Sequence, residues 1–272
     1  MSAVALAPQL PHQLRSAVED RLSEILARTS APADRAKPLP LSLRTALDVA
    51  AEGAAAEGVA TEGLHASTID ELLPDGGLPR GAVIELASPR VLGRSTSVAL
   101  AACAAAQAEA RLRSGDPQTV GAWCAFVDPW STLHAPTVKR SGVDPMRLLV
   151  VRPPLDALAR VVVRIAQSRA FSMIVVDLAG VPGAEIAMEG ASSSVRLDRW
   201  VNIVRRIALA LEKTDSSVLL LTDALAPRPL PLPVAMRLEL DRNAHDRWSL
   251  RIAKERHGRV GPAMAMTAGA AR

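Results

Sequence analysis

Along most of this 272-residue chain, segments with the apolar pattern of a strand alternate with segments with the apolar pattern of a helix. Short apolar runs, which are typical of buried strands, precede longer stretches in which apolar residues recur every three or four positions, the period of a helix. Such alternation is typical of a parallel sheet flanked by helices. From residue 67 onward the pattern therefore predicts an α/β fold with a mostly parallel central sheet.

These segments also give the order of the elements. Near the end of the chain the pattern no longer alternates with helices, and it predicts antiparallel strands over residues 234–240 and 248–256. The remaining predicted strands are 82–87, 122–127, 147–151, 172–177 and 217–221, and the predicted helices are 97–113, 133–141, 155–168 and 196–213.

The residues before the α/β pattern form two different kinds of segment. The first contains an apolar stripe, to which Leu14, Val18 and Leu22 belong, with charged residues between its members, so it predicts an amphipathic helix. The second is rich in Ala, Pro and Glu without a clear apolar face, as linkers are. The expected parts of the chain are an N-terminal helix (1–28), a flexible linker (29–66), the α/β core (67–262) and a disordered tail (263–272).

Composition narrows the class of protein only slightly. The net charge is +4, but Arg outnumbers Lys by 28 to 4, which is typical of GC-rich bacterial genomes, so basicity is weak evidence for an acidic partner. Aromatic residues make up only 2% of the chain, which argues against binding by base stacking. No CxxC motif or Cys/His cluster occurs, so we expect no metal site.

The two cysteines and the apolar runs bear on location. Cys103 and Cys124 lie in apolar surroundings, as buried free thiols of a reducing cytosol do. No apolar stretch reaches the length of a membrane span, and no secretory leader is recognisable at the N-terminus. We therefore expect a cytoplasmic protein without membrane association.

The candidate chemistry lies where the first predicted strand meets the first helix. Ser88 to Ser95 has the length and setting of the phosphate-binding loop G-x-x-x-x-G-K-[ST], in which backbone N–H groups and a helix N-terminus hold phosphates. Gly93 and Ser95 match the pattern, whereas Ser88 replaces its first glycine and Arg94 its lysine. Because Arg is longer and planar and Ser88 adds a Cβ, we expect no cofactor in tight complex, with weak binding of ATP and magnesium left open.

Several further segments follow one another in a recognisable order: GGLPRG (76–81), CAFVDP (124–129), SGVDPMRLLVVRP (141–153) and MIVVDL (173–178). In this order they resemble the core of the RecA recombinase, and the resemblance covers roughly residues 69–261. It implies that Asp177 stands at the Walker B position, where it holds magnesium or merely caps the next turn. It also implies that Trp130 replaces the glutamate that activates water, so hydrolysis loses its general base.

The regions that correspond to the two DNA-binding loops of RecA are residues 181–195 and 223–233. Arg228 is their one basic residue, and binding a DNA strand requires Lys or Arg aimed at its phosphates. We therefore expect no strong direct DNA binding.

A RecA fold with an altered phosphate loop, no catalytic glutamate and no DNA-binding loops resembles the ImuA family of mutagenesis accessory proteins. The resemblance implies a non-catalytic role in SOS-induced translesion DNA synthesis, in the cytoplasm and at the nucleoid during DNA damage. The partners it implies are RecA, an ImuB-like inactive polymerase homologue and, indirectly, an error-prone DNA polymerase III alpha-type subunit. Two other functions remain open: a weak or conditional ATPase that uses Arg94 and Asp177, and a SulA-like cell-division inhibitor.

Two surfaces are candidates for partner binding. In RecA-like proteins an N-terminal helix packs on a neighbouring subunit, which makes the apolar stripe of Leu14, Val18 and Leu22 a candidate; packing on its own core is the alternative. The second surface is the basic C-terminal segment. Its candidate contacts are Arg251, Lys254 and Arg256, with an exposed, charged edge strand as the alternative.

Overall fold

The computed structural model describes the α/β part of the chain and little of what precedes it. All described residues belong to one compact unit, Lys37–Arg272. The described residues are 40–42, 70, 73–90, 94–114, 121–182, 184, 199–226, 231–242, 248–261 and 264–265.

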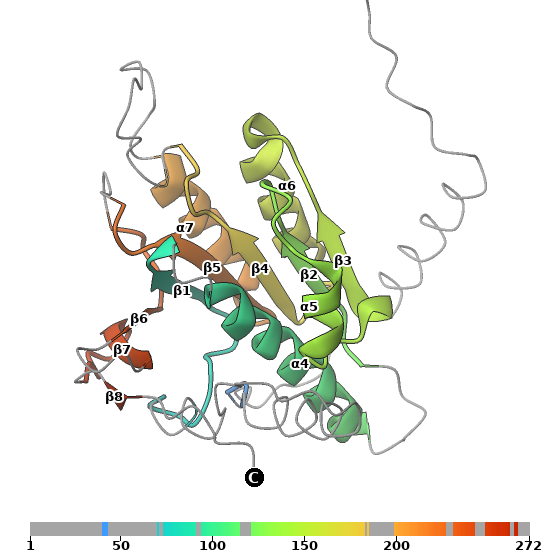
Figure 1. Cartoon of the computed structure of the whole chain (residues 1–272), viewed down its shortest axis with the longest axis horizontal. Coiled ribbons are helices and arrows are strands. Elements are labelled where there is room, and N and C mark those ends of the chain that lie inside the picture. Colours follow the sequence, from blue (N-terminus) through green and yellow to red (C-terminus); the bar gives the residue numbers. More distant parts are fainter. Residues whose placement is uncertain are drawn as a thin grey trace, which may run out of the picture. The chain divides into compact units, whose positions relative to one another are not determined.

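Eight strands of the described part form a single sheet in the order β3-β2-β4-β5-β1-β6-β7-β8 (Figure 1). Neighbouring strands from β3 to β6 are parallel, whereas β6 with β7 and β7 with β8 are antiparallel. The predicted α/β fold, with a mostly parallel sheet and antiparallel strands at its C-terminal end, is confirmed. The strands are β1 Val83–Ser88, β2 Cys124–Val127, β3 Leu148–Val151, β4 Met173–Asp177, β5 Ser217–Asp223, β6 Met236–Arg242, β7 Trp248–Glu255 and β8 Met264–Ala265.

Helices cover both faces of the sheet (Figure 1). The Ala-rich helix α4 (Ser95–Ser114) packs on one face, together with residues of the short α5 (Ala135–Arg140). Helices α6 (Leu155–Ser168) and α7 (Arg199–Leu211) pack on the other face. Because both faces of the central strands are covered, these strands are mostly apolar, as expected of a parallel sheet, with Glu85 of β1 as a buried charged exception.

The structure corrects two of the predicted segment types. Within the predicted linker, Leu41 is fully buried and forms an antiparallel bridge with Leu78, with both N–H···O distances at 2.8 Å. A Cβ at Gly77 would lie 2.4 Å from the Leu41 carbonyl oxygen, so a glycine is needed for this close approach. The linker prediction is therefore wrong for residues 40–42, where a short alternation of Leu39, Leu41 and Leu43 with Pro40 and Ser42 has the period of a strand.

The C-terminal tail gives the second correction. Met264–Ala265, which fall in the predicted disordered tail, form strand β8 and pair with Ser249 and Leu250 of β7. The predicted N-terminal helix, with Leu14, Val18 and Leu22, lies outside the described residues. Among the helices that are described, none has the length and apolar character needed to cross a membrane.

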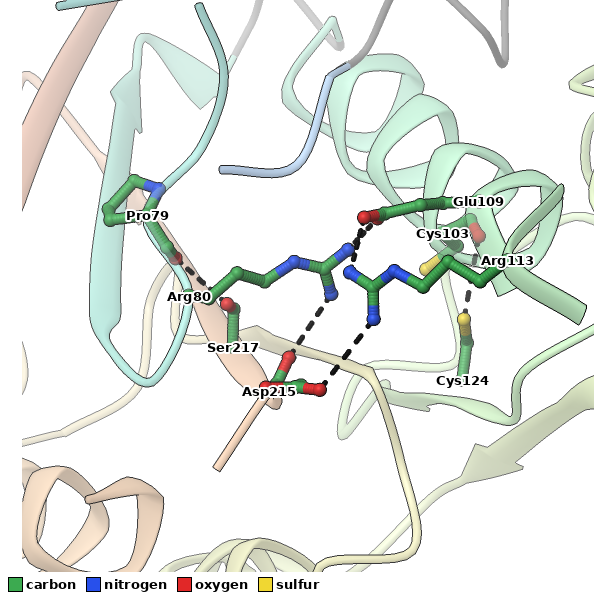
Figure 2. A network of polar contacts seen from close by, with 8 residues as sticks. All are labelled: Pro79, Arg80, Cys103, Glu109, Arg113, Cys124, Asp215 and Ser217. Carbon is green, nitrogen blue, oxygen red and sulfur yellow. Dashed lines mark hydrogen bonds and ion pairs between the residues drawn. The ribbon is translucent and has the colours of Figure 1, made fainter. Parts of the chain in front are cut away.

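A polar network joins the turns before β1 and β5 to the last turns of α4 (Figure 2). Arg80, whose side chain is 3% exposed, pairs with Glu109 and donates to the carbonyl oxygen of Asp215 at 3.1 Å. Arg113 pairs with the same Glu109, and its guanidinium lies 3.6 Å from the Asp215 carboxylate. Burial, helped by the nearby charge of Arg113, lowers the pKa of Arg80 to about 10. The network lies at the amino ends of these strands, opposite the edge at which the parallel strands end.

Candidate nucleotide site

Four parallel strands end at one edge of the sheet and bring the predicted site residues together there. Ser88 is the last residue of β1, Asp177 the last of β4 and Asp223 the last of β5, while Asp128 directly follows β2. In open α/β sheets, ligands bind at this edge, outside the carboxyl ends of the strands. The edge is therefore the place at which to test whether a magnesium nucleotide fits.

The phosphate-loop segment begins at Ser88, the last residue of β1, and ends at Ser95, the first residue of α4. Ser88 is 3% exposed, its carbonyl accepts from the Ala224 N–H at 3.1 Å, and its hydroxyl has no hydrogen-bond partner among the described residues. Arg94 and Ser95 lie at the start of α4, partly exposed, and Gly93 lies outside the described residues. The helix N-terminus that would face a phosphate is thus present, with Arg94 beside it.

Arg90, which the sequence did not single out, reaches across this edge. Its backbone N–H points to the Asp223 carboxylate at 3.4 Å, and its guanidinium lies over the Trp130 ring, 6.0 Å from the ring centroid. A Cβ on Gly180 would lie 2.7 Å from an Arg90 guanidinium nitrogen, so the glycine makes room for it. The charge of Arg90 is close enough to Asp177 to lower the pKa of that carboxyl. A cation of the chain itself therefore lies near the end of β4.

Trp130 connects the segments that follow β2 and β4. Its indole N–H donates to the Ala179 carbonyl oxygen at 2.8 Å. The turn that carries it is held by Asp128, which is fully buried and accepts from the Thr132 N–H at 2.9 Å, the Thr132 hydroxyl at 3.1 Å and the Leu133 N–H at 2.9 Å. The side chain at the position of the expected general base is thus an indole in a fixed place, and it cannot accept a proton.

Asp177 caps the turn that follows β4, which is one of the two roles considered for it. Its carboxylate accepts from the Ala179 N–H at 3.1 Å. Burial is the main influence on its titration and raises the pKa of Asp177; the negative charge of Asp128 acts in the same direction, while the Ala179 N–H and Arg90 oppose both. Among the described residues, no cluster of three His, Cys, Asp or Glu side chains is placed to hold a metal ion.

Comparison with known proteins agrees with the observed fold. The family model of the RecA N-terminal domain matches residues 51–225, more than half of the chain. The chain belongs to this RecA family. It is 35% identical to Protein RecA of Cutibacterium acnes over 153 residues, which is 55% of this chain and 39% of that protein. It is 36% identical to Protein RecA of Mycolicibacterium smegmatis over 154 residues, 56% of this chain and 39% of that protein. The chain thus spans about two fifths of the length of these curated relatives.

In this RecA-family chain, the raised pKa of Asp177 has a consequence for stability. A carboxyl whose pKa in the folded state lies above its ordinary value of 3.8 contributes stability at pH values below 3.8. This contribution is lost as the pH rises through the pKa of the folded state. We expect Asp177→Asn to raise the free energy of unfolding at pH 7, with an advantage that shrinks as the pH falls toward 3.8. Urea unfolding across this range measures it.

Asp177→Ala is the control for that prediction. Asn keeps an oxygen that accepts from the Ala179 N–H, whereas Ala leaves this N–H without its acceptor and should be less stable than Asn at every pH. An Asn variant that loses stability at pH 7 would contradict the account.

Some cations of the basic C-terminal segment form ion pairs within the chain, and others are exposed. Arg259 pairs with Asp75 through two contacts of 2.9 Å and with Glu255 at 3.2 Å, which ties the end of β7 to the turn before β1. Of the predicted partner contacts, Arg251 and Lys254 line one groove, whereas Arg256 is exposed and does not line it. The sequence could not separate these roles, because all four residues are cations of one short stretch.

The Arg259–Glu255 pair predicts a change in acid stability. The hydrogen bond from Arg259 lowers the pKa of Glu255 from 4.5 to about 2. A carboxyl with a lowered folded pKa contributes stability above its unfolded pKa, and this contribution is lost as the pH falls from 4.5 through about 2. Arg259→Ala should therefore be less stable than wild type at pH 6 and approach it as acid is added, by thermal unfolding. The exposed neighbour variant Arg256→Ala should show no such convergence.

Proposed function

We propose that this chain is a non-catalytic accessory protein of the RecA fold that acts in SOS-induced translesion DNA synthesis. In this proposal it binds RecA and an ImuB-like inactive polymerase homologue, and through the latter an error-prone DNA polymerase III alpha-type subunit, at the nucleoid of damaged cells. The supporting observation is the candidate nucleotide edge, where Arg90 and Trp130 of the chain itself lie across the ends of β1, β2 and β4.

The residues at this edge do not fit a magnesium nucleotide. The Arg90 N–H is directed at Asp223, and the Arg90 guanidinium lies near the Asp177 carboxylate that would have to hold the metal. A divalent cation placed there would face the positive charge of Arg90, and the indole of Trp130 offers no base for water. The fold of an ATPase without a usable ATP site favours a role in binding other proteins.

The family relationship supports RecA as one of those partners. Proteins that share a fold with a filament-forming relative can keep the surfaces on which like subunits pack while the chemistry of the site is lost, because surface and site are separate properties of a fold. The sequence resemblance to ImuA proteins supports the ImuB-like partner.

Nucleotide binding is the first test of the non-catalytic part of the proposal. Purified protein is titrated with a fluorescent ATP analogue and Mg²⁺, with Arg94→Lys alongside because it restores the expected lysine. We expect no saturable binding by wild type up to millimolar nucleotide. Binding in the micromolar range would overturn the proposal that the site is unused.

Partner binding is tested by co-purification at low salt with RecA and with the ImuB-like protein, each tagged separately. Capture of this chain by both supports the proposal. Capture by neither, with folded protein shown by its thermal transition, would overturn it.

A conditional ATPase is a second candidate, favoured by the presence of Arg94 and Ser95 at the start of α4 and by the buried Ser88 hydroxyl, which has no hydrogen-bond partner among the residues that the structure describes. This function requires hydrolysis in the presence of RecA that disappears in Asp177→Ala. Phosphate release that is no faster than that of RecA alone would exclude it.

A further inference from the structure

A groove of about 420 Å³ opens beside strands β6 and β7. The β6 residues that line it, Arg237 and Glu239, alternate along the strand with Met236 and Leu238. Met236 and Leu238 belong to the core on the α4 face of the sheet, so Arg237 and Glu239 lie on the opposite face, which α6 and α7 cover elsewhere. The core cluster of α6 and α7 contains no residue of β6 or β7, so it does not cover the strand side of the groove. The apolar wall consists of Pro231, which is exposed, and of Leu232 and Val234, which are 4% exposed and join this wall to the α6 and α7 cluster.

The carboxylates of the groove are already paired. Glu85 is 1% exposed; it accepts from the Thr222 hydroxyl at 2.8 Å and lies 3.9 Å from an Arg237 nitrogen. Glu239 pairs with Arg237 at 3.2 Å and also with Arg251. Each carboxylate therefore has a cation beside it, and neither repels an incoming anion as an isolated charge would.

Lys254 supplies the remaining charge. It lines the same groove, is exposed, and makes no ion pair or hydrogen bond within the part of the chain that the structure describes. Three cations thus face two carboxylates in the groove, which leaves one positive charge next to an apolar wall. The groove is complementary to one negative charge beside an apolar group.

We propose that this groove binds an acidic segment of a partner protein, in which a carboxylate pairs with Lys254 and an adjacent apolar side chain packs on Leu232 and Val234. The inference rests on the function proposed above, because it supplies the surface and the chemistry by which an accessory protein would hold another protein. It requires no nucleotide and no part of the edge formed by Arg90 and Trp130.

A peptide carboxylate suits the groove better than a phosphate. Phosphate sites are typically built from backbone N–H groups at helix N-termini or glycine-rich turns, or from Arg side chains that are free to make two hydrogen bonds. The described lining residues come from strands and from residues 231–234, and both arginines already pair with Glu239. A single ammonium beside an apolar wall matches a carboxylate flanked by an aliphatic side chain.

The test uses a defined peptide and the full chain. The probe is an acetylated, amidated Gly-Asp-Leu-Glu-Leu-Gly peptide, titrated into ¹⁵N-labelled protein and followed by amide chemical shifts. The neutral analogue carries Asn and Gln in place of the acids. We expect saturable shifts around residues 231–237 and 251–254 with the acidic peptide only, and a Kd raised roughly threefold in Lys254→Gln, as for the loss of an exposed ion pair. Lys213→Gln, which removes an exposed lysine after α7, is the matched control and should leave the Kd unchanged.

Charge reversal gives a second, independent readout. Lys254→Glu should abolish binding of the acidic peptide and should bind the analogue that carries Lys at both acidic positions. Equal binding of the neutral peptide, shifts confined to other surfaces, or displacement of the peptide by inorganic phosphate at lower concentration would each overturn the inference.

The outcome is separable from that of the proposed function. Capture of the chain by RecA and the ImuB-like protein without peptide binding in the groove would remove the groove alone. Peptide binding that depends on Lys254, without capture by either protein, would remove those partners and leave the acidic-segment site.

Discussion

Arg80→Ala is expected to lower the free energy of unfolding by about 3 kcal/mol, because it removes one member of a buried, charged network. Arg80 is almost fully buried, and its partners come from α4 and from the turn before β5 (Figure 2). Removing it leaves Glu109 with only its more exposed partner Arg113 and leaves the Asp215 carbonyl without its donor. Urea unfolding at neutral pH gives the change from the shift in midpoint at unchanged slope.

Arg113→Ala is the matched control for this prediction. Its side chain is 47% exposed and pairs with the same Glu109, from one helical turn away. Exposed pairs of this kind contribute roughly 0.3–0.5 kcal/mol, so the two arginines should differ several-fold in cost. Equal losses would mean that burial does not decide the strength of the network.

The sequence predicted the elements of this fold well where periodicity is strong. The predicted helix at residues 155–168 has the bounds of α6, because apolar residues mark one face from its first turn to its last. The predicted helix at 97–113 begins two residues later than α4, since an Ala-rich segment buried on most sides has no polar face to mark its ends. The pairing of Leu41 with Leu78 was missed, because the strand-like alternation of Leu39, Leu41 and Leu43 spans only five residues and contains a proline.

The sequence indicated where the candidate site residues lie in the fold, but it did not indicate which side chains contact one another there. The order of strands and motifs placed Ser88, Trp130 and Asp177 at strand ends, and parallel topology brings such ends to one edge. The stacking of Arg90 on Trp130 depends on the space left by Gly180, which lies 90 residues from Arg90 in sequence. Contacts of this kind are set by side-chain packing between loops, which has no signal in one sequence.

Asp128 is the residue on which the arrangement of Trp130 depends. Its carboxylate is fully buried and accepts three hydrogen bonds, from two backbone N–H groups and one hydroxyl, within the five residues that follow it. A hydrogen bond contributes about 1 kcal/mol net, so the loss of these three bonds together costs about 3 kcal/mol. We expect Asp128→Ala to lower the free energy of unfolding by about 3 kcal/mol.

The same change should free the indole of Trp130 from the Ala179 carbonyl, because the turn that aims it loses its acceptor. Trp130 emission, obtained as the difference between each protein and its Trp130→Phe counterpart, should shift to longer wavelength in Asp128→Ala. Thr132→Val is the control: it removes only the hydroxyl contact to Asp128 and should cost about 1 kcal/mol without moving the emission. If both variants lose the same stability and neither changes the emission, Trp130 is positioned by its contact with Arg90 and not by Asp128.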